Sequence, residues 1–267
     1  MALLRDTLFA AVMIILNDII GLSLLIGGRR HLIQSFNVEG MTDAVATSAI
    51  IITLGFVLPN FVGGKTGTYT PLQLGTVALA TTVIFVGFLL FQTVLHRDYF
   101  ITKSKGDTGE TAAPSDNRTT MISLALLLAS LVAVVLSAKS ISPTLDALLN
   151  RLGAPSATLG ILIAAIVLLP EFVAAMQAAR LNRLQSSLNL AMGSAIASIG
   201  LTLPVVALVA LSMGWTLQLG LGGAAMTLLV LTLFVVALSL RTGKATLLPG
   251  LLHLVLFVVY LGFNFMP

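Results

Sequence analysis

The 267-residue chain contains no cysteine and very few charged residues. The absence of cysteine excludes disulfides, thiolate catalysis and cysteine-ligated zinc or iron–sulfur centres. Charged residues make up 9% of the chain, whereas a typical soluble domain contains about 25%. Because a water-soluble protein of this length needs far more charge to cover its surface, the composition excludes a soluble enzyme, a nucleic-acid-binding domain and a disordered chain.

Hydrophobic residues make up 57% of the sequence and are grouped into long runs. A run of about 18 or more apolar residues can cross the roughly 30 Å hydrocarbon layer of a membrane as a helix. Because these runs are continuous rather than alternating, they predict helices and not the strands of a barrel. We therefore expect an all-α, multi-pass membrane protein with about eight transmembrane helices, at residues 8–27, 44–62, 72–95, 120–138, 156–179, 185–212, 221–240 and 246–265.

Lysine and arginine are distributed unequally between the two sides of these predicted helices. One side carries ten, Arg29, Arg30, Arg97, Lys103, Lys105, Arg118, Arg180, Arg183, Arg241 and Lys244, and the other carries four, Arg5, Lys65, Lys139 and Arg151. Since cytoplasmic loops are enriched in basic residues, we place the first set in the cytoplasm and both termini outside. The net charge of +4 is interpreted as this bias, in a plasma (inner) membrane protein, and not as a nucleic-acid-binding surface.

The hydrophilic segment 96–119 is predicted to be a flexible cytoplasmic linker. It divides the chain into a three-helix part, residues 1–95, and a five-helix part, residues 120–267. Residues 141–153 are expected to form a separate short amphipathic helix at the outer surface, ended by Gly153.

Two carboxylates lie deep within the predicted helices, Asp18 and Glu171. An ionisable group at this depth is costly and is therefore a candidate for a functional site. Glu171 directly follows Pro170, which interrupts helical hydrogen bonding, and transporters use such broken helices to coordinate ions. The alternative is a structural Glu171 that is hydrogen-bonded by Ser or Asn of a neighbouring helix. We favour a cation- and proton-binding role.

The predicted sixth helix has one face of small and hydroxyl-bearing residues, spaced four, three, four and four apart: Ser187, Ala191, Ser194, Ser198 and Thr202. This spacing places all five on one stripe of a helix, which is the expected partner surface of Glu171. Gly193 is expected to let another backbone approach, and Asn189 adds an amide. The alternative is ordinary packing of small residues between membrane helices.

Polar residues also occur in the middle of the first predicted helix. Asn17 either lines a hydrated ion path or makes a hydrogen bond between helices, and the sequence leaves both interpretations open. Its neighbour Asp18 is a candidate second cation ligand. His253, within the last predicted helix, is interpreted as a packed histidine and not as a proton relay. No spacing of histidines indicates a bound metal cofactor.

The segment LLPEFVAAMQAARLNRLQSSLNLAMGSAIASIGLTLPVVAL (168–208) resembles the second alpha-repeat of ChaA-like calcium/proton antiporters, members of the calcium/cation antiporter superfamily. RDTLFAAVMIILNDIIGLSLLIGGRRH (5–31) is similar to the latter half of the first alpha-repeat, and HLVLFVVYL (253–261) also fits. The resemblance implies a sodium/calcium-exchanger fold of two inverted five-helix halves plus one extra helix, with the cation site between the two repeats.

By this resemblance, Glu171 would be the acidic cation ligand of the second repeat, with Gly193 and Ser194 as its Gly-Ser pair. Asn17 would be the corresponding asparagine of the first repeat and Ser198 its pseudo-symmetric mate. Glu171, Ser194 and Asn17 are thus the metal ligands that the resemblance implies. It also implies calcium, or sodium and potassium, exchanged for protons, with no cofactor and no enzymatic activity.

The sequence departs from the family pattern at several positions. Leu168 occupies the place of an asparagine, Val12-Met13 replaces the first-repeat Gly-Ser, and Asp18 stands where a small neutral residue is expected. About three helices of the first half, including the one with its glutamate, would lie upstream of Met1, which leaves a partial inverted repeat. The alternative function is therefore a transport-incompetent fragment that needs a partner for these helices. The expected partners are the lipid bilayer, small cations, and either a second copy or the missing helices.

Overall fold

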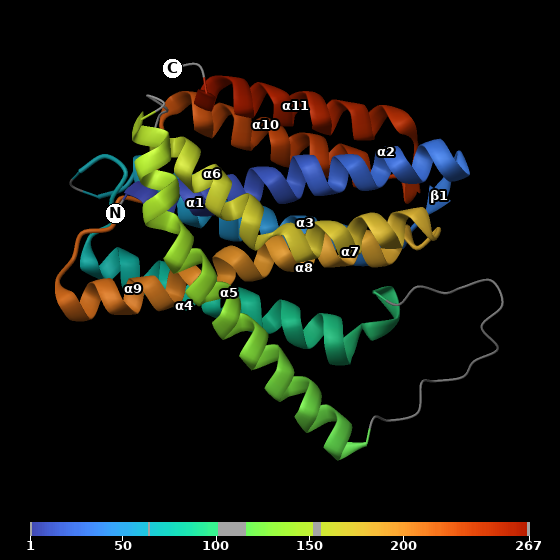
Figure 1. Ribbon diagram of the computed structural model, residues 1–267, viewed down its shortest axis with the longest axis horizontal. Helices are drawn as coiled ribbons and strands as arrows, with labels where there is room; N and C mark the ends of the chain where they lie inside the picture. Colours follow the sequence, from blue (N-terminus) through green and yellow to red (C-terminus); the bar gives the residue numbers. More distant parts are fainter. Residues whose placement is uncertain (1, 64, 101–115, 152–155, 266–267) are drawn as a thin grey trace.

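The computed structural model describes residues 2–63, 65–100, 116–151 and 156–265, which are almost entirely helical (Figure 1). The α-helices are α1 (Ala2–Met13), α2 (Ile20–His31), α3 (Val38–Ile52), α4 (Pro71–Leu90), α5 (Asn117–Arg151), α6 (Ser156–Val167), α7 (Leu169–Arg180), α8 (Leu184–Gly200), α9 (Thr202–Met213), α10 (Gly223–Leu240) and α11 (Leu247–Phe265). Shorter segments are the π-helices η1 (Ile14–Ile19), η2 (Thr53–Val57) and η4 (Phe91–Leu95), the 3₁₀ turns η3 (Leu58–Asn60) and η5 (Arg97–Tyr99), and the strands β1 (Gln34–Ser35) and β2 (Lys244–Ala245).

The described helices are long and apolar enough to make this an integral membrane protein, as predicted. Six continuous helical stretches can each cross a membrane: Leu3–His31, Val38–Asn60, Pro71–Leu95, Leu184–Met213, Gly223–Leu240 and Leu247–Phe265. Thr158–Val167 and Leu169–Arg180, which meet at a bend of 57°, form a seventh candidate span if the bent pair crosses the membrane as one unit. These seven agree with seven predicted helices, and the eighth, 120–138, falls within α5.

The prediction of a separate surface helix at 141–153 is wrong, because residues 141–151 continue α5 without a break. Pro143 lies inside this helix, where it removes one hydrogen bond, to the carbonyl four residues earlier, without ending the helix. Gly153 lies outside the described residues. The first turns of α5 point away from the other helices, and its last turns approach α6 (Figure 1).

Helices from before and after the predicted linker are interleaved in one bundle. In this bundle α1 packs against α6, α2 against α7 and α11, and α3 against α8. The predicted linker itself falls largely on residues 101–115, outside the described residues. The candidate cation ligands of both parts are therefore held by one shared set of helix contacts.

The contact between α2 and α11 depends on glycine. A Cβ added to Gly250 would lie 2.7 Å from the Leu25 nitrogen and 2.8 Å from the Gly21 oxygen. A Cβ at Gly21 would lie 2.9 Å from the Cβ of His253. Small residues of this kind let the backbones of membrane helices approach closely. This approach places α11 against the middle of the first span, where η1 lies.

Charged turns lie at both ends of the bundle. At one end, Arg5 donates a hydrogen bond to the Gly220 carbonyl, and the Gly220 N–H donates to the Gly67 carbonyl. At the other end, β1 and β2 pair in antiparallel register, with Gln34 opposite Ala245 and Ser35 opposite Lys244. This second end gathers the turns that follow α2, α7 and α10 (Figure 1).

Replacing Gly250 with alanine should destabilise the protein, because the added methyl group would meet backbone atoms that cannot move aside. We expect a loss of about 1–3 kcal/mol, the usual effect of overpacking, measured as a lower midpoint of thermal unfolding in detergent. Gly262→Ala, in the same helix, is the matched control, since a Cβ there meets nothing within 4 Å. Equal unfolding midpoints for the two variants would contradict this account of the α2–α11 contact.

Candidate cation site

Glu171 is positioned by the break between α6 and α7. Pro170 lies in the first turn of α7 and has no N–H to donate to the carbonyl of Ile166, four residues earlier. The chain bends by 57° here, and Glu171 occupies the first turn of the new helix. The unpaired N–H groups of a helix N-terminus favour a negative charge in this position. The break thus leaves the Ile166 carbonyl without its usual helical donor and places the Glu171 carboxylate close to it along the chain.

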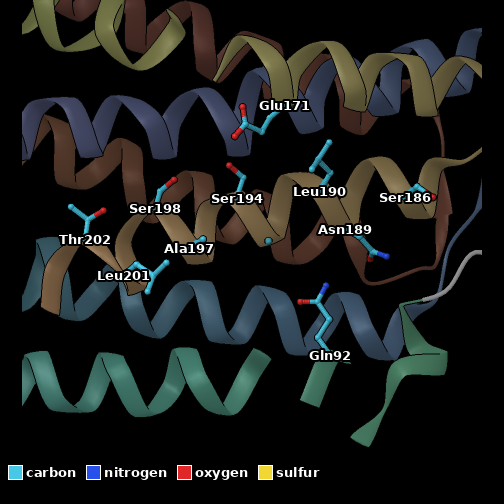
Figure 2. Close-up of a pocket in the computed structure, with 11 residues that line it drawn as sticks. Gln92, Glu171, Ser186, Asn189, Leu190, Ser194, Ala197, Ser198, Leu201 and Thr202 are labelled. Atoms are coloured by element: carbon cyan, nitrogen blue, oxygen red, sulfur yellow. The ribbon is translucent and has the colours of Figure 1, made fainter. Parts of the chain in front are cut away.

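Glu171 faces a cavity of about 750 Å³ between α7, α8 and η4 (Figure 2). The cavity is lined by Gln92, Glu171, Ser186, Asn189, Leu190, Gly193, Ser194, Ala197, Ser198, Leu201 and Thr202. Figure 2 shows the carboxylate of Glu171 and the hydroxyl of Ser194 on facing sides of the gap between α7 and α8. Five of the predicted site residues therefore come together here: Glu171, Asn189, Gly193, Ser194 and Ser198.

One oxygen of the Glu171 carboxylate, Oε2, is buried and has no hydrogen-bond partner among the described residues. Burying an ionised carboxylate without a partner is costly, so this oxygen is suited to a bound proton, a bound cation or a water molecule of the cavity. The described residues contain no group of three or more His, Asp or Glu side chains that could hold a metal ion. A cation bound beside Glu171 would therefore be held by one carboxylate together with neutral oxygen atoms.

The predicted stripe, which runs along α8 to the first residue of α9, divides into two parts with different surroundings. Ser194, Ser198 and Thr202 line the cavity. Ser187 instead is fully buried and donates a 2.7 Å hydrogen bond to the hydroxyl of Ser23 in α2. The prediction of one continuous polar face is therefore wrong for its first turn, because α2 covers α8 there. Helical spacing alone does not report which turn a neighbouring helix covers.

Gly193 also differs from its expected role. A Cβ added at this position would meet nothing within 4 Å, so no other backbone approaches here. The glycine widens the cavity instead of permitting a close helix contact. Leu168, where the family pattern has asparagine, precedes α7 without giving it a side-chain cap.

The amide of Asn189 lines the cavity, but both its oxygen and its nitrogen already form hydrogen bonds. Its Oδ1 accepts a 2.8 Å hydrogen bond from Gln185 Nε2, and its Nδ2 donates to the carbonyl of Phe100. Asn189 therefore ties α8 to the segment that follows η4. Gln92, in η4, was missed by the sequence analysis; the detectable signal was a single amide near the end of an apolar run.

Asn17 does not line the cavity. It is fully buried in η1, where its Nδ2 donates to Thr232 Oγ1 at 3.0 Å and its Oδ1 lies 3.3 Å from His253 Nδ1. The other ring nitrogen of His253 lies 3.2 Å from Ser239 Oγ. Of the two interpretations of Asn17, the structure therefore supports a hydrogen bond between helices. His253 is packed and satisfied, in the manner expected of a structural histidine.

Asp18 follows Asn17 in η1 and is half-buried. It is not among the residues that line the cavity, although η1 as a whole contacts α7 and α8. Its role as a second cation ligand stays a prediction. The π-helical widening of this turn was not visible in the sequence.

Comparison with known proteins identifies what this arrangement is similar to. The family model described as "Sodium/calcium exchanger protein" matches residues 122–266. The putative ionic transporter y4hA of Sinorhizobium fredii is 45% identical over 98% of this chain, which spans 72% of that relative. The sodium-potassium/proton antiporter ChaA of Escherichia coli is 34% identical over 97% of this chain and 71% of that relative. The crystal structure of an H⁺/Ca²⁺ exchanger, CAX, has the same fold, with a TM-score of 0.68 at 15% identity, over 96% of this chain and 64% of that one.

The cavity should be accessible to water-soluble reagents, and the absence of native cysteine makes this directly testable. Ser194→Cys and Ser198→Cys should react readily with a hydrophilic thiol reagent. Ser187→Cys is the matched control on the same helix, and it should react at least roughly ten-fold more slowly, since it is exposed only when α2 and α8 separate. Labelling rates can be measured by mass shift in detergent. Equal rates at positions 187 and 194 would contradict the assigned cavity.

Proposed function

The chain belongs to the sodium/calcium exchanger family, and from this premise we propose that it exchanges a cation for protons at the cavity beside Glu171. The observation that carries the proposal is the buried, unpartnered Oε2 of Glu171 in a cavity lined by hydroxyls. Either a proton or a cation satisfies that oxygen, and the two cannot occupy it together. Glu171 is also the single carboxylate among the lining residues.

Exchange follows from this competition when the cavity opens to one side of the membrane at a time. A proton neutralises the carboxylate, which removes the cost of a buried charge. A cation binds the ionised carboxylate and recruits neutral oxygens from its surroundings. An empty ionised site leaves the charge buried without compensation, so the change of access is favoured only when one ligand is bound. This condition couples the two fluxes.

We propose calcium as the transported cation. Calcium takes six to eight oxygen ligands in flexible arrangements, and the polar lining of the cavity includes such oxygens: one carboxylate, the hydroxyls of Ser194, Ser198 and Thr202, and the amide oxygen of Gln92. Sodium and potassium also bind oxygen ligands, and the Escherichia coli relative is named for them. They form the second candidate. No cofactor or catalytic step is part of this proposal.

Replacing Glu171 with glutamine should abolish exchange, because the amide cannot release or bind the transported proton. In everted vesicles that hold a proton gradient, calcium should collapse the gradient with the wild-type chain. With Glu171→Gln it should have no more effect than in vesicles without the protein. Glu39→Gln is the control, since Glu39 is exposed at the start of α3 and outside the cavity. Wild-type exchange by folded Glu171→Gln would overturn the proposal.

Cation binding can be measured without transport, which separates the identity of the ion from the exchange itself. A ligand that binds the folded state raises the unfolding midpoint as its concentration passes its dissociation constant. Calcium should stabilise the wild-type protein in detergent at lower concentrations than sodium or potassium, and Glu171→Gln should remove this difference. Stabilisation by sodium or potassium at lower concentrations than calcium would establish the second candidate instead.

A further inference from the structure

Three turns of the chain converge at one end of the bundle. They follow α2, α7 and α10, which lie far apart in the sequence (Figure 1). Gln34 Nε2 donates hydrogen bonds to the Ala179 carbonyl at 3.2 Å and to Asn182 Oδ1 at 2.9 Å. The His31 ring also reaches the Arg180 carbonyl at 3.2 Å. Together with the pairing of β1 and β2, these contacts join the three turns into one surface.

This surface is strongly basic. We call it the basic turn cluster, and its exposed cations are Arg29, Arg30, Arg180, Arg183, Arg241 and Lys244. Among the described residues, the ion pair between Arg5 and Asp6 is the only one, and it lies at the opposite end of the bundle. Glu39, the acidic residue nearest in sequence to β1, forms no ion pair with these cations. The cluster therefore holds six positive charges without an acidic partner within it.

Large aliphatic side chains are interleaved with these cations. Leu32, Ile33, Leu181 and Leu248 are between 61% and 78% exposed. Leu32 has a positive φ of 62°, an unfavourable conformation for a leucine, which persists only where the surrounding contacts impose it. A surface that combines arginines with exposed leucines is suited to the boundary between headgroups and acyl chains.

We propose that the basic turn cluster binds the headgroup of an anionic phospholipid. The guanidinium groups match phosphate oxygens in bidentate geometry, and basic pockets between membrane helices are known to hold acidic headgroups. The exposed leucines favour a lipid over a soluble anion, because the acyl chains and glycerol of a lipid would cover them. Occupation of the cluster would tie α2, α7 and α10 together, and this binding does not depend on which ion the cavity exchanges.

The test is retention of phosphatidylglycerol by the purified full-length chain in an uncharged detergent, followed by native mass spectrometry as the lipid is titrated. The wild-type protein should bind phosphatidylglycerol in preference to phosphatidylcholine. Since each surface charge contributes about 1 kcal/mol, Arg180→Gln/Arg183→Gln should weaken this binding about 30-fold. Arg29→Gln/Arg30→Gln should have a similar effect and provides an independent variant if the first fails to fold.

Lys65→Gln removes an exposed charge at the opposite end of the bundle, near Gly67 and Arg5, and should leave phosphatidylglycerol binding unchanged. Inorganic phosphate at millimolar concentration should not displace the lipid. Displacement by phosphate would identify a site for a soluble anion and overturn the proposal. Equal weakening by the control variant would also overturn it, because the effect would then follow total charge and not this cluster.

Discussion

A carboxylate oxygen buried without a hydrogen-bond partner is the constraint on which the other features of the site depend. Glu171 Oε2 lies in a membrane-spanning segment whose surroundings offer it no donor among the described residues. The free-energy cost of such a group is tolerated in membrane proteins where a ligand or proton compensates it. The break at Pro170, the hydroxyls of α8 and the open space beside Gly193 all lie around this one atom.

Interrupted helices are how this protein places polar groups at membrane depth. α6 and α7 are separated by a bend, α8 and α9 by Leu201, and α1 and α2 by the π-helical turn η1. Each interruption changes the hydrogen bonding of a few backbone groups, which membrane proteins tolerate only where these groups are buried in protein or line a cavity. The hydrogen bonds of Asn17 with Thr232 and His253 hold η1 against α10 and α11. Polar residues of α8 thus line the cavity, whereas Asn17 in η1 forms hydrogen bonds to neighbouring helices.

Site residues could be predicted from sequence where a polar residue lies within an apolar run. They were harder to predict where the role depends on which way the side chain points. Glu171 after Pro170 was recognisable from sequence as a candidate site carboxylate, and Ser194 and Ser198 were recognisable from their spacing along one helix; all three line the cavity. Ser187 shares that spacing but is covered by α2. Asn17 was open between two roles, because an amide that lines an ion path and one that bonds a neighbouring helix have the same sequence signature. Gln92 was overlooked, since only the path of η4 brings it to the cavity.

The sequence by itself determined that this is a helical membrane protein, where seven of its candidate spans lie, and that Glu171 is the stronger of two candidate site carboxylates. These properties follow from the length of each hydrophobic run and from the free-energy cost of burying a charge, and both can be recognised in a short stretch of sequence. The tertiary structure alone decided which turn of each helix faces the cavity, the uninterrupted course of α5 through Pro143 and the meeting of three basic turns at one end. These properties depend on contacts between residues far apart in the chain, such as Gly250 against Gly21 and Gln34 against Asn182, and periodicity within one helix carries no information about them.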